Sequence, residues 1–244
     1  MKYISYFNEL DSTKIFEQSL RNNYKSRGNI SDINQIVYGN APIEFKEIIE
    51  DKNDPIRKWF EKEGLIEKII KEAPLNDSET TRKDLEELLE LTSNATGDDV
   101  TFARYADDQS NLPNIFIDFL NSKGYEETMD GYFRIDNQTD AILNYLKDVI
   151  NRPRPYQLAK AYDIPLYPLI RTDAMTAAYP SGHALTAFTM AEHYARKHPE
   201  IASEVREVGE KIARSREVVG IHYPSDTKIS RYICDIMFQN DLIK

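Results

Sequence analysis

The sequence has little that could cross-link or anchor it, since Cys234 is the single cysteine among 244 residues. An intramolecular disulfide is therefore excluded, and the fold cannot depend on oxidation. No stretch approaches the ~20 consecutive apolar residues that a membrane-spanning helix requires. The first residues hold no apolar run of signal-peptide length, so we expect a cytoplasmic protein with no membrane span.

Glycine and alternating β-branched residues are also scarce, and the chain has 9 glycines. Apolar residues recur at helical spacing instead, which is typical of amphipathic helices. The clearest segments are residues 56–70, 85–91, 115–120, 142–150, 185–194 and 205–219. Asp54 is a candidate N-cap before Pro55, and Gly124 is a candidate C-cap. The sequence therefore predicts an all-α fold, with a helical bundle core and additional N-terminal helices.

The formal net charge is −10, from 31 Lys and Arg residues against 41 Asp and Glu residues. Such an acidic surface repels nucleic acids and anionic membranes, so we expect no nucleic-acid partner. Four acidic residues of one predicted helix, Asp84, Glu86, Glu87 and Glu90, are interpreted as a solvated face. A local cluster of arginine and lysine can still bind an anion, since distant charges are screened within ~8–10 Å.

Three segments in the second half of the chain concentrate residues that suit anion chemistry. In the first, Lys147 and Arg154 are seven residues apart, and Pro153 predicts that the helix ends near Ile150 or Asn151. Arg154 then lies in an extended segment, where its planar fork suits phosphate oxygens, and Lys147 adds a compact charge. The alternative is a helix that ends in cations because they complement its dipole.

The second segment, Pro180-Ser181-Gly182-His183, precedes a run with helical periodicity. Free N–H groups at a helix start form a ready anion site. Gly182 lets the backbone approach a ligand closely, Ser181 offers a hydroxyl, and His183 falls in the first turn over the same spot. The alternative is a serine-capped helix with an incidental histidine.

The third segment runs from Ser215 and Arg216 to His222 and Asp226. If a helix follows His222, the histidine and Asp226 share one face at i, i+4. The carboxylate can then fix the tautomer that leaves the other ring nitrogen nucleophilic, and Arg216 adds a second guanidinium. The alternative is a structural His–Asp pair on a surface helix.

In order and spacing the three segments read Lys-x6-Arg-Pro, Pro-Ser-Gly-His and Ser-Arg-x5-His-x3-Asp. This pattern resembles the signature of the type 2 phosphatidic acid phosphatase superfamily, which includes class A acid phosphatases and vanadium haloperoxidases. The matching positions are Lys147, Arg154, Pro155, Pro180, Ser181, Gly182, His183, Ser215, Arg216, His222 and Asp226. The resemblance covers roughly residues 140–232, and the residues that flank the motifs resemble soluble acid phosphatases more than haloperoxidases.

The resemblance implies a role for each of these side chains. His222 would be the nucleophile that forms a phosphohistidine, Asp226 would orient it, and His183 would act as general acid and then as base. The phosphoryl oxygens would be bound by Lys147, Arg154, Arg216, Ser181 and the backbone N–H of Gly182. Three cations would then take the place of a metal ion, so we expect no metal and no required cofactor.

We therefore expect a metal-independent phosphomonoesterase that hydrolyses a small soluble phosphate ester. The alternatives are a vanadate-dependent haloperoxidase that uses the same anion site and a lipid phosphate phosphatase. Phosphate or vanadate is expected to occupy the site, and a homo-oligomer is left open. We also expect a single all-α domain over residues 1–244, with accessory helices over 1–130 and the phosphatase core motifs over 131–244.

Overall fold

The computed structural model describes residues 54–171 and 176–243, and for residues 130–137 it describes the backbone alone. This part of the chain is built from helices and contains no strand, which confirms the predicted all-α fold. The elements in chain order are α4 (Pro55–Lys62), α5 (Leu65–Glu72), α6 (Glu79–Asn94), α7 (Gly97–Asp107), η1 (Gln109–Asn111), α8 (Leu112–Ser122), α9 (Asp130–Ile150), α10 (Pro155–Leu158), η2 (Ala159–Tyr162), α11 (Gly182–Lys197), η3 (Pro199–Ile201), α12 (Ala202–Val218) and α13 (Pro224–Gln239). None of the helices in this part of the chain is both long and apolar enough to cross a bilayer. The accessory helices expected before residue 54 lie outside the described residues.

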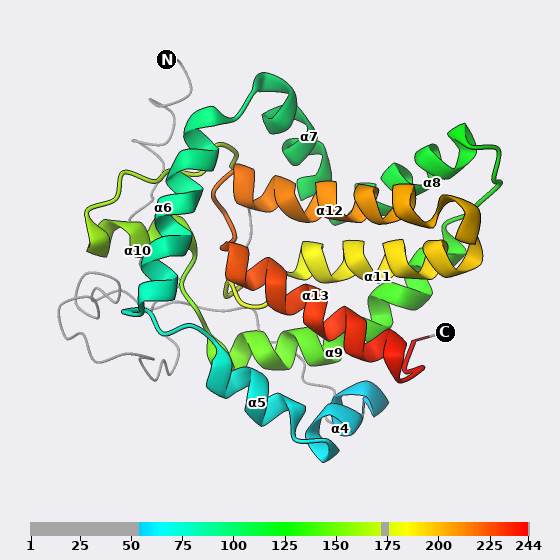
Figure 1. Cartoon of the computed structure of the whole chain (residues 1–244), viewed down its shortest axis with the longest axis horizontal. Helices are drawn as coiled ribbons and strands as arrows, with labels where there is room; N and C mark the ends of the chain where they lie inside the picture. Colours follow the sequence, from blue (N-terminus) through cyan, green and yellow to red (C-terminus); the bar gives the residue numbers. More distant parts are fainter. Residues whose placement is uncertain (1–53, 172–175, 244) are drawn as a thin grey trace.

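Helix α11 lies at the centre of the bundle, with α12 and α13 along its sides and α9 beneath it (Figure 1). Its closest neighbour is α12, which returns along it after the short turn at η3. Gly209 of α12 lies at the contact between the two helices. A Cβ atom at Gly209 would lie 2.8 Å from the Cβ of Ala191 and 3.1 Å from the backbone oxygen of Ala187. The small residues therefore allow the two helix axes to approach closely.

Two apolar clusters fix α11 from opposite sides. One joins α4, α5, α9, α11 and α13 and includes the buried side chains of Phe60, Leu146 and Phe188. The other joins α7, α8, α11 and α12 and includes Phe116 and Tyr194. Burial of one large apolar side chain contributes about 1.5–3 kcal/mol relative to leaving it exposed. Because α11 belongs to both clusters, the position of its N-terminus is well determined.

The ends of the helices follow local signals, with one difference from the predicted segments. Residues 56–70 form two helices, because Gly64 adopts a φ of +68° in the left-handed region and separates α4 from α5. The predicted N-cap at Asp54 is confirmed, whereas the C-cap of α8 is Lys123, one residue before the predicted Gly124. The Oδ1 of Asp54 accepts a hydrogen bond from the backbone N–H of Arg57 at 2.7 Å. Gly124 follows α8 with a φ of +87°.

Helix α6 lies across the ends of α12 and α13 (Figure 1). The interpretation of its acidic residues as a solvated face holds for Glu86, Glu87 and Glu90, which are exposed. It is wrong for Asp84, which is buried and accepts a hydrogen bond from Arg152. The reason is electrostatic, since a buried arginine needs a carboxylate partner to offset the loss of hydration.

Replacement of Gly209 by alanine is expected to destabilise the bundle, although alanine normally favours a helix by roughly 0.5–1 kcal/mol over glycine. The added methyl group would overlap Ala191 and the backbone of α11, at a cost of about 1–3 kcal/mol. Thermal unfolding followed by circular dichroism should show a lower Tm. Gly97→Ala is the matched control, because nothing lies within 4 Å of a Cβ atom there. A Tm of Gly209→Ala at or above that of the wild type would contradict the tight contact.

Candidate active site

His222 and Asp226 form a buried pair where the chain enters α13. Pro224 is the first residue of that helix, and Asp226 lies in its first turn. The Oδ2 of Asp226 accepts a hydrogen bond from the backbone N–H of Tyr223 at 2.9 Å and lies 3.1 Å from Nδ1 of His222. One carboxylate therefore caps the helix and holds the imidazole, as the spacing predicted.

Arg154 and Asp226 together fix the tautomer of His222. Its Nη1 lies 2.7 Å from Nε2 of His222, and a guanidinium can only donate. Nε2 must therefore carry the lone pair, and Nδ1 carries the hydrogen that is donated to Asp226. Arg154 is held in turn by the backbone oxygens of Thr176 and Ile221, at 3.0 and 3.1 Å. The unprotonated nitrogen of the ring thus faces a fixed cation.

The segment after α9 places Lys147 and Arg154 on the same side of the site. Helix α9 ends at Ile150, and Asn151 turns the chain with a left-handed φ of 45°. Arg154 is extended, with φ −67° and ψ 153°, which confirms that it leaves the helix. Lys147 lies on the last turn, where its Nζ donates to the backbone oxygen of Ala177. Both cations are buried, and both act electrostatically on the ring of His222.

The N-terminus of α11 is joined to the pair at the start of α13. The backbone N–H of Ser181 donates to the backbone oxygen of Asp226 at 3.3 Å. The Oγ of Ser181 accepts from the N–H of Ala184 at 3.4 Å, so Ser181 is the N-cap of α11. An accepting hydroxyl keeps its own hydrogen, so Ser181 can still donate to an anion. Gly182 also serves the packing of α11 on α9, since a Cβ atom there would lie 3.2 Å from Leu143.

His183 and Arg216 meet at the C-terminal end of α7, a contact that sequence reasoning missed. The Nε2 of His183 lies 2.9 Å from the backbone oxygen of Asp107, and Arg216 forms an ion pair with the carboxylate of Asp107. Because a carbonyl oxygen only accepts, Nε2 of His183 carries a hydrogen. No motif marks Asp107, which is the last residue of α7.

Burial and neighbouring cations lower the pKa values of both histidines. Burial, followed by the charge of Arg216, lowers the pKa of His183 to about 3. Burial, followed by the charges of Arg154 and Lys147, lowers the pKa of His222 well below its ordinary value. Each imidazole is therefore neutral at pH 7, and the charge of the surrounding cations is of the sign that attracts an anion.

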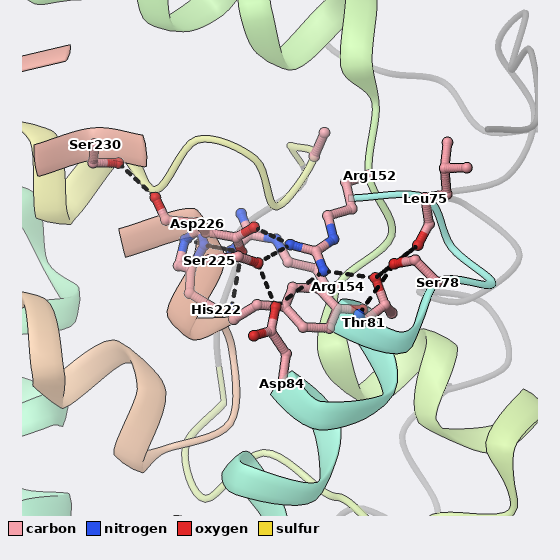
Figure 2. A network of polar contacts seen from close by, with 12 residues as sticks. Leu75, Ser78, Thr81, Asp84, Arg152, Arg154, His222, Ser225, Asp226 and Ser230 are labelled. Carbon is pink, nitrogen blue, oxygen red and sulfur yellow. Dashed lines mark hydrogen bonds and ion pairs between the residues drawn. The ribbon is translucent and has the colours of Figure 1, made fainter. Parts of the chain in front are cut away.

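Arg152, which sequence reasoning did not single out, reaches the other end of the His222–Asp226 pair (Figure 2). Its Nη1 donates to Oδ1 of Asp226 at 2.8 Å and to Oγ of Ser225 at 2.6 Å. Its guanidinium stacks over the ring of Tyr223, 3.6 Å from the centroid. The sequence did contain a signal for Arg152, its position two residues before Arg154, because side chains two residues apart in an extended segment point to the same side.

Comparison with known proteins adds the family. A model of the PAP2 superfamily matches residues 138–238, which include every site residue predicted from the sequence. This region, less than half of the chain, is similar to the PAP2 superfamily. The match indicates a phosphatase, and hence a hydrolase.

The other comparisons give weaker similarity or none. A solved structure, described as the first transmembrane PAP2 type phosphatidylglycerolphosphate phosphatase from Bacillus subtilis, is 16% identical with a TM-score of 0.45. That alignment covers 78% of this chain and 98% of that chain. A search of curated proteins finds no match. Helices α6 and α7, which contact the site, lie outside the part of the chain that matches the PAP2 superfamily.

The low pKa of His183 makes acid conditions unfavourable for the fold. A histidine that stays neutral when folded takes up a proton on unfolding once the pH falls below about 6.5, so stability is lost as the pH falls from there toward about 3. We expect the urea midpoint to be lower at about pH 5 than at about pH 7.5. His183→Asn should narrow that difference, because asparagine does not titrate. An equal difference in the two proteins would contradict the assignment.

Proposed function

We propose that the protein is a metal-independent phosphomonoesterase in which Nε2 of His222 attacks phosphorus and forms a phosphohistidine. The observation that supports this most directly is the fixed tautomer, since Arg154 donates to Nε2 and Asp226 accepts from Nδ1. A neutral imidazole whose lone pair faces a cluster of cations is a nucleophile aimed at a bound anion. A purely structural His–Asp pair would not need cations next to the ring nitrogen that faces away from the aspartate.

Lys147, Arg154 and Arg216 would hold the phosphoryl oxygens, together with Ser181 and the first N–H groups of α11. A phosphoryl group in transfer spreads negative charge over its equatorial oxygens, and donors already in place stabilise that charge. The ester would enter between Arg154 and His222. The guanidinium of Arg154 would then donate to a phosphoryl oxygen instead of to Nε2 of His222. Orthovanadate, which forms the same trigonal bipyramid, would compete for this cradle.

His183 would supply the proton for the leaving group. Its Nε2–H is engaged by Asp107, so Nδ1 is the nitrogen that exchanges a proton with the substrate. A bound dianion would offset the charge of Arg216 and raise the pKa of His183, which then carries the second proton. The pKa in the phosphate complex would therefore lie closer to the operating pH, as a general acid requires.

The two chemical steps then balance. In the first, a bond forms between phosphorus and Nε2 of His222, the P–O ester bond breaks, and the departing oxygen takes the proton from Nδ1 of His183. In the second, water attacks phosphorus and gives a proton back to Nδ1, the P–N bond breaks, and inorganic phosphate leaves. His183 thus acts once as acid and once as base.

We infer that the substrate is a small soluble phosphate ester. The net charge of −10 disfavours nucleic acid as a partner, whereas the buried cations of the site suit a compact anion. We expect the protein to be cytoplasmic, and we leave open whether it forms a homo-oligomer.

A phosphoenzyme on His222 is the direct test. Protein mixed with a radiolabelled phosphate ester in EDTA, and quenched in alkaline denaturant, should retain label that acid removes, because N–P bonds are acid-labile. His222→Ala should retain no label and lose at least about 1,000-fold in kcat/KM. His193→Ala is the control, since His193 lies on α11 outside the site and packs edge-on against Tyr194. Label on another residue, or loss of turnover in EDTA, would contradict the proposal.

Leaving-group dependence tests the role of His183. A p-nitrophenolate can leave without a proton, whereas an alkoxide cannot. His183→Ala should therefore lose about 10- to 100-fold more in kcat/KM with an alkyl phosphate than with p-nitrophenyl phosphate, because general acid catalysis is worth roughly 100- to 10,000-fold when it is needed. Equal losses with both substrates would mean that His183 does not protonate the leaving group.

A further inference from the structure

Arg152 connects the His222–Asp226 pair to helix α6, which lies outside the PAP2 match. Arg152 is 2% exposed, and its guanidinium lies between two carboxylates (Figure 2). On one side, Nη1 donates to Oδ1 of Asp226 at 2.8 Å. On the other, Nη2 donates to Oγ1 of Thr81 at 3.0 Å and to Oδ2 of Asp84 at 3.3 Å. Because Thr81 and Asp84 belong to α6, that helix holds the outer side of the arginine.

The hydrogen bonds that Arg152 makes in this network have only one possible direction. The Oγ1 of Thr81 gives its hydrogen to the backbone oxygen of Leu75 at 2.7 Å, and Ser225 gives its hydrogen to Asp84. Both hydroxyl oxygens therefore offer Arg152 a lone pair and no hydrogen. Arginine has donors alone, so the geometry of Arg152 is fixed by partners that cannot reverse.

The charges reinforce this arrangement. Burial raises the pKa of both Asp84 and Asp226, and the charge of Arg152 opposes that shift in each. Without Arg152, two buried carboxylates would face each other, and one would take up a proton. A protonated Asp226 could donate to Nδ1 of His222, and Arg154 alone would then favour the tautomer that leaves Nε2 bare.

We propose that Arg152, held in place by Asp84 of α6, is a positioning residue for phosphoryl transfer. Arg152 fixes the carboxylate of Asp226, Asp226 fixes the imidazole of His222, and Nε2 is thereby aimed into the anion cradle. Arg154 acts on Nε2 from the other side, so two arginines of one extended segment hold the pair at both ends. This inference rests on the proposed function of His222 as the nucleophile.

Steady-state kinetics separate positioning from binding. Arg152→Met should lower kcat for p-nitrophenyl phosphate by about 100-fold, the usual cost of misplacing a catalytic group by about one ångström. The inhibition constant of inorganic phosphate should change by less than about 3-fold, because Lys147, Arg154 and Arg216 remain. Arg152→Lys keeps the charge without the planar fork and should recover about 10-fold of the loss.

Arg57→Met is the matched control for removal of a buried arginine. Arg57 is 6% exposed, pairs with Glu61 at 3.1 Å and stacks over Tyr145, outside the site. This variant should keep the wild-type kcat. If Arg57→Met lowers kcat as much as Arg152→Met does, the loss reflects general destabilisation, and the positioning role is overturned.

A double-mutant cycle tests the link to α6. Asp84→Asn alone should lower kcat by about 10-fold, as is usual for a group that orients another functional group. In the Arg152→Met background it should cause no further loss, because Asp84 acts through Arg152. Losses that multiply would show that Asp84 acts by a separate route, which would overturn its part in the proposal.

Nitrogen-15 NMR of His222 gives a readout that does not depend on turnover. Near neutral pH the wild type should show hydrogen on Nδ1 and a bare Nε2, whereas Arg152→Met should show a mixture of tautomers.

If no phosphohistidine is trapped but the tautomer changes in Arg152→Met, the proposed function fails and the positioning role stands. An unchanged tautomer and unchanged kcat in folded Arg152→Met would overturn it. Circular dichroism shows whether Arg152→Met folds. If it does not, the His222 tautomer and kcat are measured instead in Arg152→Lys and Asp84→Asn, which keep a polar group.

Discussion

Buried positive charge governs how this molecule is arranged. Four basic residues are each at most 5% exposed: Lys147, Arg152, Arg154 and Arg216. Removing an ion from water costs several kcal/mol unless partners replace its hydration. Here those partners are carboxylates and backbone oxygens, and they come from segments as distant in sequence as α6, α7 and α13. The helices must therefore pack together before the buried charges can contact their partners.

The helices can supply these partners because several of their ends converge. Helices α9 and α12 end at the site, and α11 and α13 begin there, while α6 lies across the ends of α12 and α13 (Figure 1). The two helix starts bring partial positive charge and free N–H groups to the same place as the cations. The first part of the sequence signature lies at the end of α9, the second at the start of α11, and the third spans the end of α12 and the start of α13. The apolar clusters around α11 hold these ends in register.

This correspondence explains what the sequence could predict. Within each segment the functional residues are a few positions apart, so local helix geometry was enough to relate His222 to Asp226 and to place Arg154 beyond the end of α9. Asp107 could not be found in this way, because it reaches the site through the packing of α7. Asp84 did leave a signal. It lies four residues before Leu88 and shares the buried stripe of α6 with Leu85, so an acidic side chain at a core-facing position marked a buried ion pair.

The role of the Arg152 network follows from what buried ion pairs do and do not contribute. A buried pair is weak support for stability, since apolar residues of similar volume often stabilise a core equally well or better. Packing α6 against the bundle therefore does not require Asp84 and Arg152, because Leu85 and Leu88 already bury an apolar face. What an apolar contact cannot do is impose a direction on Asp226. Arg152, which can only donate, supplies that constraint. We therefore assign the charges of this network to the orientation of His222 rather than to the stability of the fold.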